Sequence, residues 1–79
     1  MGKLATIRNI IIRVYANDHL PPHFHIVAPD FEALVEISTM AVLAGRNPSA
    51  AKDVMEWAIA NRELIVAEWN RVNPRFPIA

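Results

Sequence analysis

The spacing of the apolar residues changes near Ser38, and this change constrains the fold more than any other feature of the sequence. Before Ser38, apolar and polar residues alternate, which is the pattern of strands with one buried face. After Pro48, apolar residues recur three and four positions apart, which is typical of amphipathic helices. The sequence therefore predicts an α+β protein whose strands precede its helices.

Three segments alternate in this way, and we predict a strand for each. They are residues 7–16, 23–27 and 32–37. Turn-forming residues separate them, including Pro21-Pro22 and Pro29-Asp30. Because consecutive strands with short connections usually pair with each other, we expect a three-stranded antiparallel meander. Residues 39–43 are interpreted as an irregular connection.

The last third of the sequence predicts two helices that pack on one face of this sheet, in the order β-β-β-α-α. Asn47 would cap the first helix and Pro48 would occupy its first position, whereas Asn61 would end that helix and begin the second. A single bent helix is the alternative. The residues expected between helices and sheet are Ile10, Ile12, Val14, Phe24, Ile26, Ala33, Val35 and Ile37 from the strands, and Ala51, Val54, Met55, Ala58, Ile59, Leu64, Ile65, Trp69 and Val72 from the helices.

The composition limits the classes of function. At 79 residues we expect a single domain, residues 1–79, and the absence of cysteine excludes a disulfide framework and a thiol nucleophile. Eight basic residues balance eight acidic ones, which argues against strong DNA binding by the chain alone. No apolar run is long enough for a membrane span, and the start lacks a signal-peptide core, so we expect a cytoplasmic protein.

An apolar content of 53% is high for so short a chain. A small core hides only part of this apolar surface, so the remainder predicts contact with another protein. We therefore expect a homo-oligomer or a complex with a partner protein.

All three histidines lie within residues 17–25, which makes this segment the first candidate site. Alternation places Phe24 and Ile26 on the covered face of the sheet and the two strand histidines on the other. The candidate catalytic residues on that polar face are His23, His25, Arg13, Tyr15 and Glu36, with Glu32 beside them. They include the base, acid and cation that RNA cleavage requires, yet the same charges can form ordinary surface ion pairs.

The loop before these histidines is a candidate binding loop. Its residues are Asn17, Asp18, His19, Pro21 and Pro22. His23-x-His25 also fits a divalent metal site, with His19 or Asp18 as a third ligand. The same rings could instead bond the backbone of the loop, because His-x-His recurs in proteins without metal.

Several motifs resemble a family of small bacterial proteins described as domain of unknown function 4160. They are Ile12-x-Val14-Tyr15-x-Asn17-Asp18-His19-x-Pro21-Pro22-His23-Phe24-His25, then Val42-Leu43-x-Gly45, Glu56-Trp57-Ala58 and Glu68-Trp69. The resemblance implies a place in a toxin–antitoxin module, because members of that family are often encoded beside a small protein of domain of unknown function 2442. It does not identify which component is toxic, nor a reaction.

These observations leave three hypotheses. The first is a toxin–antitoxin component whose polar sheet face acts on RNA or meets its partner. The second is a noncatalytic binding or regulatory module that uses the same surface. The third is a small metal-binding protein based on histidine ligands.

Overall fold

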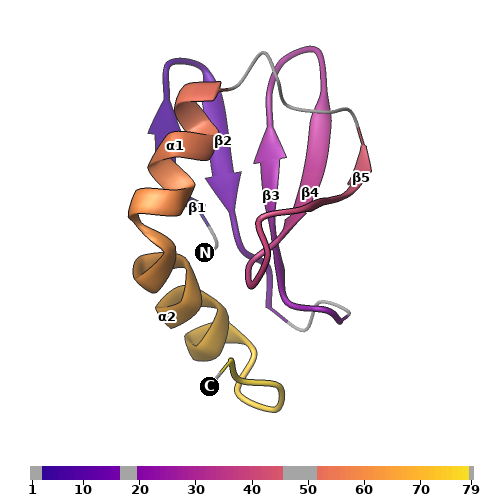
Figure 1. Ribbon diagram of the computed structural model, residues 1–79, viewed down its shortest axis with the longest axis vertical. Coiled ribbons are helices and arrows are strands. Elements are labelled where there is room, and N and C mark those ends of the chain that lie inside the picture. Colours follow the sequence, from indigo (N-terminus) through magenta and orange to yellow (C-terminus); the bar gives the residue numbers. More distant parts are fainter. Residues whose placement is uncertain (1–2, 17–19, 46–51, 79) are drawn as a thin grey trace.

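The strands form one antiparallel sheet, and the helices follow it in the chain (Figure 1). The computed structural model describes residues 3–16, 20–45 and 52–78. Its strands are β1 (Lys3–Ile7), β2 (Ile10–Arg13), β3 (His23–Val27), β4 (Glu32–Glu36) and β5 (Val42–Gly45), and its helices are α1 (Lys52–Ala60) and α2 (Arg62–Val72). Each strand pairs with its neighbours in sequence, in the order β1-β2-β3-β4-β5.

The predicted three-stranded meander is therefore wrong, because the sheet has five strands. The first addition is a hairpin at residues 3–13, where we expected one strand over residues 7–16. Arg8 and Asn9 form a two-residue turn between β1 and β2, and Arg8 has a φ of 57°. Tight hairpin turns require such positive φ values. The prediction missed the turn because branched apolar residues continue on both sides of it.

The second addition is β5, which begins within the segment that we interpreted as irregular and extends beyond it. Val42 pairs with Val35, and Gly45 pairs with Ala33. Two backbone hydrogen bonds close the turn between β4 and β5, from the Met40 amide to the Glu36 carbonyl and from the Glu36 amide to the Ala41 carbonyl, both at 2.8 Å. The alanine and glycine of β5 are depleted in strands, so this pairing depends on the turn and on β4.

Gly45 ends β5 in a conformation that favours glycine. Its φ is 87°, and a Cβ atom at this position would lie 2.3 Å from the Glu32 carbonyl oxygen and 2.9 Å from the Ala33 Cα atom. Both contacts are with backbone atoms, which a side-chain rearrangement cannot relieve. The close approach of β5 to β4 therefore requires a residue without a side chain.

The two predicted helices are confirmed, with Asn61 between them. The Asn61 side chain donates a 2.9 Å hydrogen bond to the Trp57 carbonyl in the last turn of α1. The Asn61 carbonyl accepts hydrogen bonds from the amides of Leu64 and Ile65 at the start of α2. One residue thus satisfies backbone groups of both helices. The predicted start at Asn47 and Pro48 lies outside the described residues.

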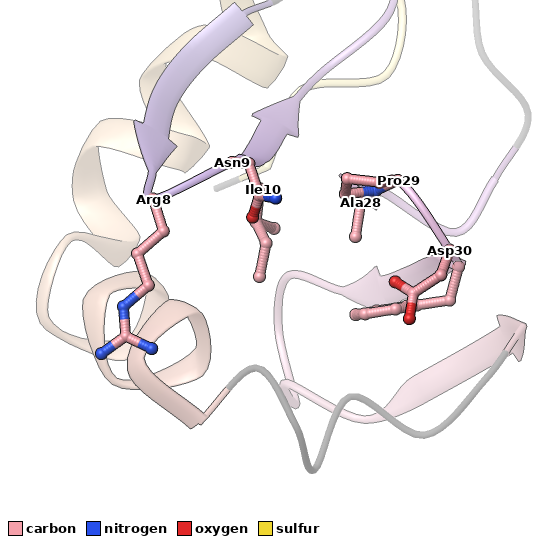
Figure 2. A pocket seen from close by; sticks show the side chains of 7 residues that line it. Arg8, Asn9, Ile10, Ala28, Pro29 and Asp30 are labelled. Atoms are coloured by element: carbon pink, nitrogen blue, oxygen red, sulfur yellow. The ribbon is translucent and has the colours of Figure 1, made fainter.

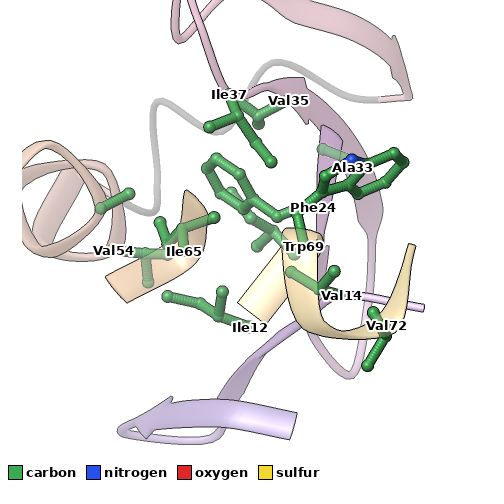
Figure 3. Close-up of a cluster of buried hydrophobic side chains, with 12 residues drawn as sticks. Ile12, Val14, Phe24, Ala33, Val35, Ile37, Val54, Ile65, Trp69 and Val72 are labelled. Carbon is green, nitrogen blue, oxygen red and sulfur yellow. The ribbon is translucent and has the colours of Figure 1, made fainter. Parts of the chain in front are cut away.

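Side chains from the sheet and both helices form a buried apolar cluster (Figure 3). Its members are Ile12, Val14, Phe24, Ile26, Ala33, Val35, Ile37, Val54, Ala58, Ile65, Trp69 and Val72. The predicted apolar sheet face is confirmed, with Ile10 only partly buried. The helix prediction was wrong for Ile59 and Leu64, which are 61% and 49% exposed because they lie on the outer side of the helices.

The segment after α2 folds back and holds the end of the helix. The Trp69 Nε1 group donates a 2.8 Å hydrogen bond to the Phe76 carbonyl. Asn70 exchanges two hydrogen bonds with the backbone of Ile78, at 3.1 and 2.7 Å. The Asn73 side chain donates a 3.0 Å hydrogen bond to the Tyr15 carbonyl, which links this segment to the residues after β2.

No helix among the described residues combines the length and the apolar character needed to cross a lipid bilayer.

Candidate functional site

The two strand histidines lie at the beginning of β3, and their side chains meet as the alternation predicts. Their ring centroids are 5.1 Å apart. Cross-strand pairing places His23 opposite Glu36 and places His25 between Arg13 of β2 and Leu34 of β4. Directly opposed residues share a face of the sheet, so Arg13 and His25 lie together.

His23 is buried, although it belongs to the nominally polar face. Its side chain and backbone together are 1% exposed, and its ring lies 5.8 Å from the Trp69 ring. The Nδ1 atom is 2.8 Å from the Pro21 carbonyl oxygen. Since a carbonyl can only accept, Nδ1 is the donor in this bond and carries a proton. Packing and this bond give His23 a structural role at the beginning of β3.

His25 is the more accessible of the two histidines. Its ring lies nearly perpendicular to the Tyr15 ring, with centroids 4.6 Å apart and an angle of 84° between the rings. Its Nδ1 atom lies 3.4 Å from Glu32 Oε2, a long contact in which Nδ1 donates to the carboxylate when the histidine tautomer places the proton there. The His25 side chain is 13% exposed and that of Glu32 is 55% exposed. Tyr15 is 39% exposed, so this group faces solvent.

We call Arg13, Tyr15, His25 and Glu32 the His25 surface. β2 supplies Arg13, the residues just after it supply Tyr15, β3 supplies His25, and β4 supplies Glu32. The Asn73 side chain fixes the Tyr15 backbone from the C-terminal segment. Three stretches of the chain therefore supply this surface, and the C-terminal segment anchors one of them. The surface combines an aromatic ring, an imidazole, a cation and a carboxylate.

Glu36 lies across from His23 in the sheet, but its carboxylate contacts the turn that follows β4. Oε2 accepts a 3.2 Å hydrogen bond from the Ser38 hydroxyl, and Oε1 accepts a 2.8 Å bond from Thr39. The Thr39 oxygen in turn accepts a 3.2 Å bond from the Ala41 amide. Glu36 thus stabilises the turn before β5, a role that its strand position did not indicate.

The candidate binding loop is only partly described. Asn17, Asp18 and His19 lie outside the described residues. The Leu20–Pro21 peptide bond is cis, and the Pro22 carbonyl accepts a 3.1 Å hydrogen bond from the Ile37 amide. The end of the loop is therefore attached both to the first residue of β3, through the His23 side chain, and to Ile37, the residue after β4.

The described residues do not contain a set of ligands for the hypothetical metal site. Among them, no group of three or more histidine or acidic side chains could hold an ion. The proposed third ligands, His19 and Asp18, are not among those residues. A metal site with these ligands stays a prediction.

A separate pocket lies at the opposite end of β2 and β3 (Figure 2). Its volume is about 440 Å³, and it opens between the β1–β2 turn and residues 28–31. Arg8 at its rim forms a 2.9 Å ion pair with Asp53 of α1. Neither strand histidine lines this pocket, so it is not part of the His25 surface.

Sequence reasoning missed the contribution of Trp69 to this site. Trp69 is fully buried, contacts the His23 ring and is bonded to Phe76. Its helical spacing predicted a core position, which is confirmed. The alternation of β3 cannot predict that the Trp69 ring, from a helix much later in the sequence, packs against His23.

The fold and this surface define a class of small α+β protein with a five-stranded meander, two helices and a histidine-bearing open sheet face. The family model described as Domain of unknown function (DUF4160) matches residues 9–70. This match spans well over half of the sequence, so the chain belongs to the DUF4160 family. Comparison with curated proteins and with solved structures gives no match.

Proposed function

We propose that this chain is the partner-binding component of a toxin–antitoxin type module and that the His25 surface contacts its protein partner. The observation that carries the proposal is the grouping of Tyr15, His25 and Glu32 on a solvent-facing part of the sheet. Tyrosine and arginine are enriched at the energetic centres of protein interfaces. Both occur here within a few residues of each other on β2 and its continuation.

The kind of partner is supported by the sequence resemblance described above. The resemblance implies that relatives are often encoded beside a small protein of domain of unknown function 2442, and we propose such a neighbour as the binding partner. The high apolar content of the chain supports a protein contact as well, because such a contact removes apolar surface from water.

The geometry favours binding over catalysis because two of the five catalytic candidates have structural contacts. His23 is buried against Trp69 and bonded to Pro21, and Glu36 holds the following turn. An RNA-cleaving site needs a base and an acid that both reach the substrate. Burial of His23 removes one of the two groups that we expected to supply them.

The test measures affinity for the small protein encoded beside this chain. We expect Tyr15→Ala and His25→Ala to weaken binding about tenfold each, which corresponds to roughly 1.4 kcal/mol. Thr6→Ala is the matched control, since Thr6 is an exposed residue of β1 on the same open face. Isothermal titration calorimetry gives the affinities, and circular dichroism verifies that each variant is folded. Folded variants that retain full affinity would contradict the proposal.

A second candidate function is RNA cleavage, which the contact between His25 and Glu32 favours. When the Glu32 carboxylate accepts a hydrogen bond from Nδ1 of His25, the Nε2 atom of the same ring is left to accept a proton from the substrate. Arg13 is opposite His25 in the sheet, and its positive charge can stabilise the negative charge of a phosphate. Purified protein incubated with RNA distinguishes the two. Hydrolysis that Glu32→Gln abolishes while partner affinity is retained would establish catalysis, and we expect no such hydrolysis.

A further inference from the structure

β5 forms an edge of the sheet and is exposed along its whole length. All four of its residues are exposed, and Val42 and Leu43 are 40% and 43% exposed despite their apolar side chains. On its inner side it pairs with β4, and no strand of the described chain pairs with its outer side. Figure 1 shows β5 at the side of the sheet away from the two helices.

The bulge in β5 leaves backbone groups without a counterpart on β4. Leu34 pairs with Ala44, but the next residue of β4, Val35, pairs with Val42. Leu43 is therefore the additional residue of a bulge, and it has no partner in the register of β4. The extra residue of a bulge is left out of the ladder, and backbone donors and acceptors need hydrogen-bond partners.

The edge also lacks charged residues and proline, which oppose pairing with another strand. Edge strands of monomeric proteins are commonly protected by charged residues or proline. Residues 37–45 contain neither, whereas β1 at the other edge begins with a lysine. A second strand can therefore approach β5 without burying a charge.

We propose that β5 pairs in antiparallel orientation with β5 of a second copy of this chain, so that two sheets join across a twofold axis. An axis between Leu43 and Ala44 places Val42 opposite Gly45 of the partner subunit and Leu43 opposite Ala44 of the partner subunit. Each large side chain then faces a small residue. The absence of charge on both strands excludes like-charge repulsion, which favours a second copy over a charged strand from another protein.

The positions of Val42 and Gly45 agree with this register. Their partners on β4 are Val35 and Ala33, both fully buried under the helices, so Val42 and Gly45 lie on the same face. Residues that oppose each other in a ladder must share a face. The bulge allows this, because it places two residues that are three positions apart on one side of β5.

The dimer should be weak and dependent on concentration, since two four-residue strands form a small interface. Sedimentation velocity of the purified chain alone, without its proposed partner, measures the association. We expect the wild-type chain to dimerise and Leu43→Lys to raise the dissociation constant at least tenfold, because two lysines would meet near the axis. Thr6→Lys places the same charge on β1, the other edge, and should dimerise like the wild type.

Mixed isotope labelling verifies the location of the contact. We expect intermolecular nuclear Overhauser effects between Leu43 and Ala44 of the two copies. Three results would overturn the proposal: a wild-type chain that stays monomeric at every accessible concentration, a dimer that Leu43→Lys leaves unchanged, or a dimer that Thr6→Lys disrupts. Binding of a different protein's strand to β5 of a monomeric chain would also overturn it. None of these measurements depends on the His25 surface.

Discussion

At the scale of single residues, His23 and His25 show how two similar positions on one strand acquire different roles. Both rings are on one face, as the alternation of β3 predicts. Trp69 covers His23, while His25 lies beside Tyr15 at the surface. The shared face could be predicted from the sequence, because it follows from strand geometry alone. The burial of His23 could not, because it depends on a contact from α2.

Trp69→Phe should destabilise the protein more than Trp57→Phe does. Trp69 is fully buried, and its Nε1 group donates to the Phe76 carbonyl. Phenylalanine leaves that carbonyl without its donor, which we expect to cost about 1–3 kcal/mol in the free energy of unfolding. Trp57 is only partly buried and serves as the matched control. Urea denaturation followed by far-ultraviolet circular dichroism measures both, and equal losses would disprove the role assigned to Trp69.

Gly45→Ala should be destabilising although it adds one methyl group. The added Cβ would meet the Glu32 carbonyl oxygen at 2.3 Å, and the φ of 87° is unfavourable for alanine. We expect a loss of about 1–3 kcal/mol. Ala44→Ser, at the neighbouring exposed position, should change stability by less than about 0.5 kcal/mol. Thermal and urea denaturation of the two variants provide the comparison, and a stable Gly45→Ala protein would argue against the observed register of β5.

At the scale of elements, the sequence predicted β3, β4 and the two helices, placed β2 within a strand that was too long, and missed two short strands. The missed elements are β1 and β5. Arg8 is an unusual residue for the positive φ of a tight turn, so the hairpin at β1 had no strong sequence signal. β5 contains alanine and glycine, which strands disfavour. Hydrogen bonds with β4 and the Glu36 contacts stabilise it, and neither follows from local propensity.

Ile65 and Leu64 are adjacent in α2 but should differ in their contribution to stability. Ile65 is fully buried between helix and sheet, whereas Leu64 is 49% exposed. Ile65→Ala removes buried atoms and leaves a cavity, so we expect a loss of about 2–5 kcal/mol. Leu64→Ala should cost less than about 0.5 kcal/mol. Urea denaturation measures both. Similar losses would show that α2 packs through a different face.

Glu68 near the end of α2 should make stability depend on pH in the acidic range. Hydrogen bonds from the Arg71 guanidinium lower the pKa of Glu68 below its ordinary value of 4.5, against the opposing effect of burial. A carboxylate with a lowered pKa stabilises the folded state above its unfolded pKa, and this stabilisation is lost as pH falls through the folded pKa. We therefore expect Glu68→Gln to be less stable than the wild type at neutral pH.

The difference between Glu68→Gln and the wild type should shrink as pH falls below 4.5 and disappear below the lowered pKa of folded Glu68, where the carboxyl is protonated in both states. Urea denaturation across this range measures it. A double-mutant cycle with Arg71→Gln supplies the control: Arg71→Gln should matter only while Glu68 is present and ionised. A difference that persists unchanged in acid would show that packing, rather than the charged hydrogen bond, is responsible.

At the scale of the whole molecule, the order of strands equals their order in the sequence. Each hairpin can therefore form between neighbours, and the apolar cluster then joins the sheet to both helices. Because the cluster contains residues from strands β2 to β4 and from both helices, removal of the helices would expose most of the buried sheet face. The sheet and helices should consequently lose structure together.

Unfolding of the purified chain should be a single cooperative transition. For 79 residues, average values predict an unfolding enthalpy of about 55 kcal/mol near 60 °C. Differential scanning calorimetry measures this value, and the van't Hoff enthalpy should agree with it if folding is two-state. Helix loss at a lower temperature than sheet loss, observed by circular dichroism, would contradict a shared core. The measurement should be made at low protein concentration, where the proposed association through β5 is minimal.

The return of the C-terminal segment along α2 offers a way to observe the His25 surface directly. Phe76 is 50% exposed, yet its backbone is held by Trp69, which touches His23, and Asn73 of the same segment holds Tyr15. The sequence contains no cysteine. Arg75→Cys therefore introduces a single thiol for a fluorescent dye close to the surface, on a backbone anchored to it. The emission of that dye can serve as an optical sensor of partner binding, with no chemical change to Tyr15 or His25 themselves.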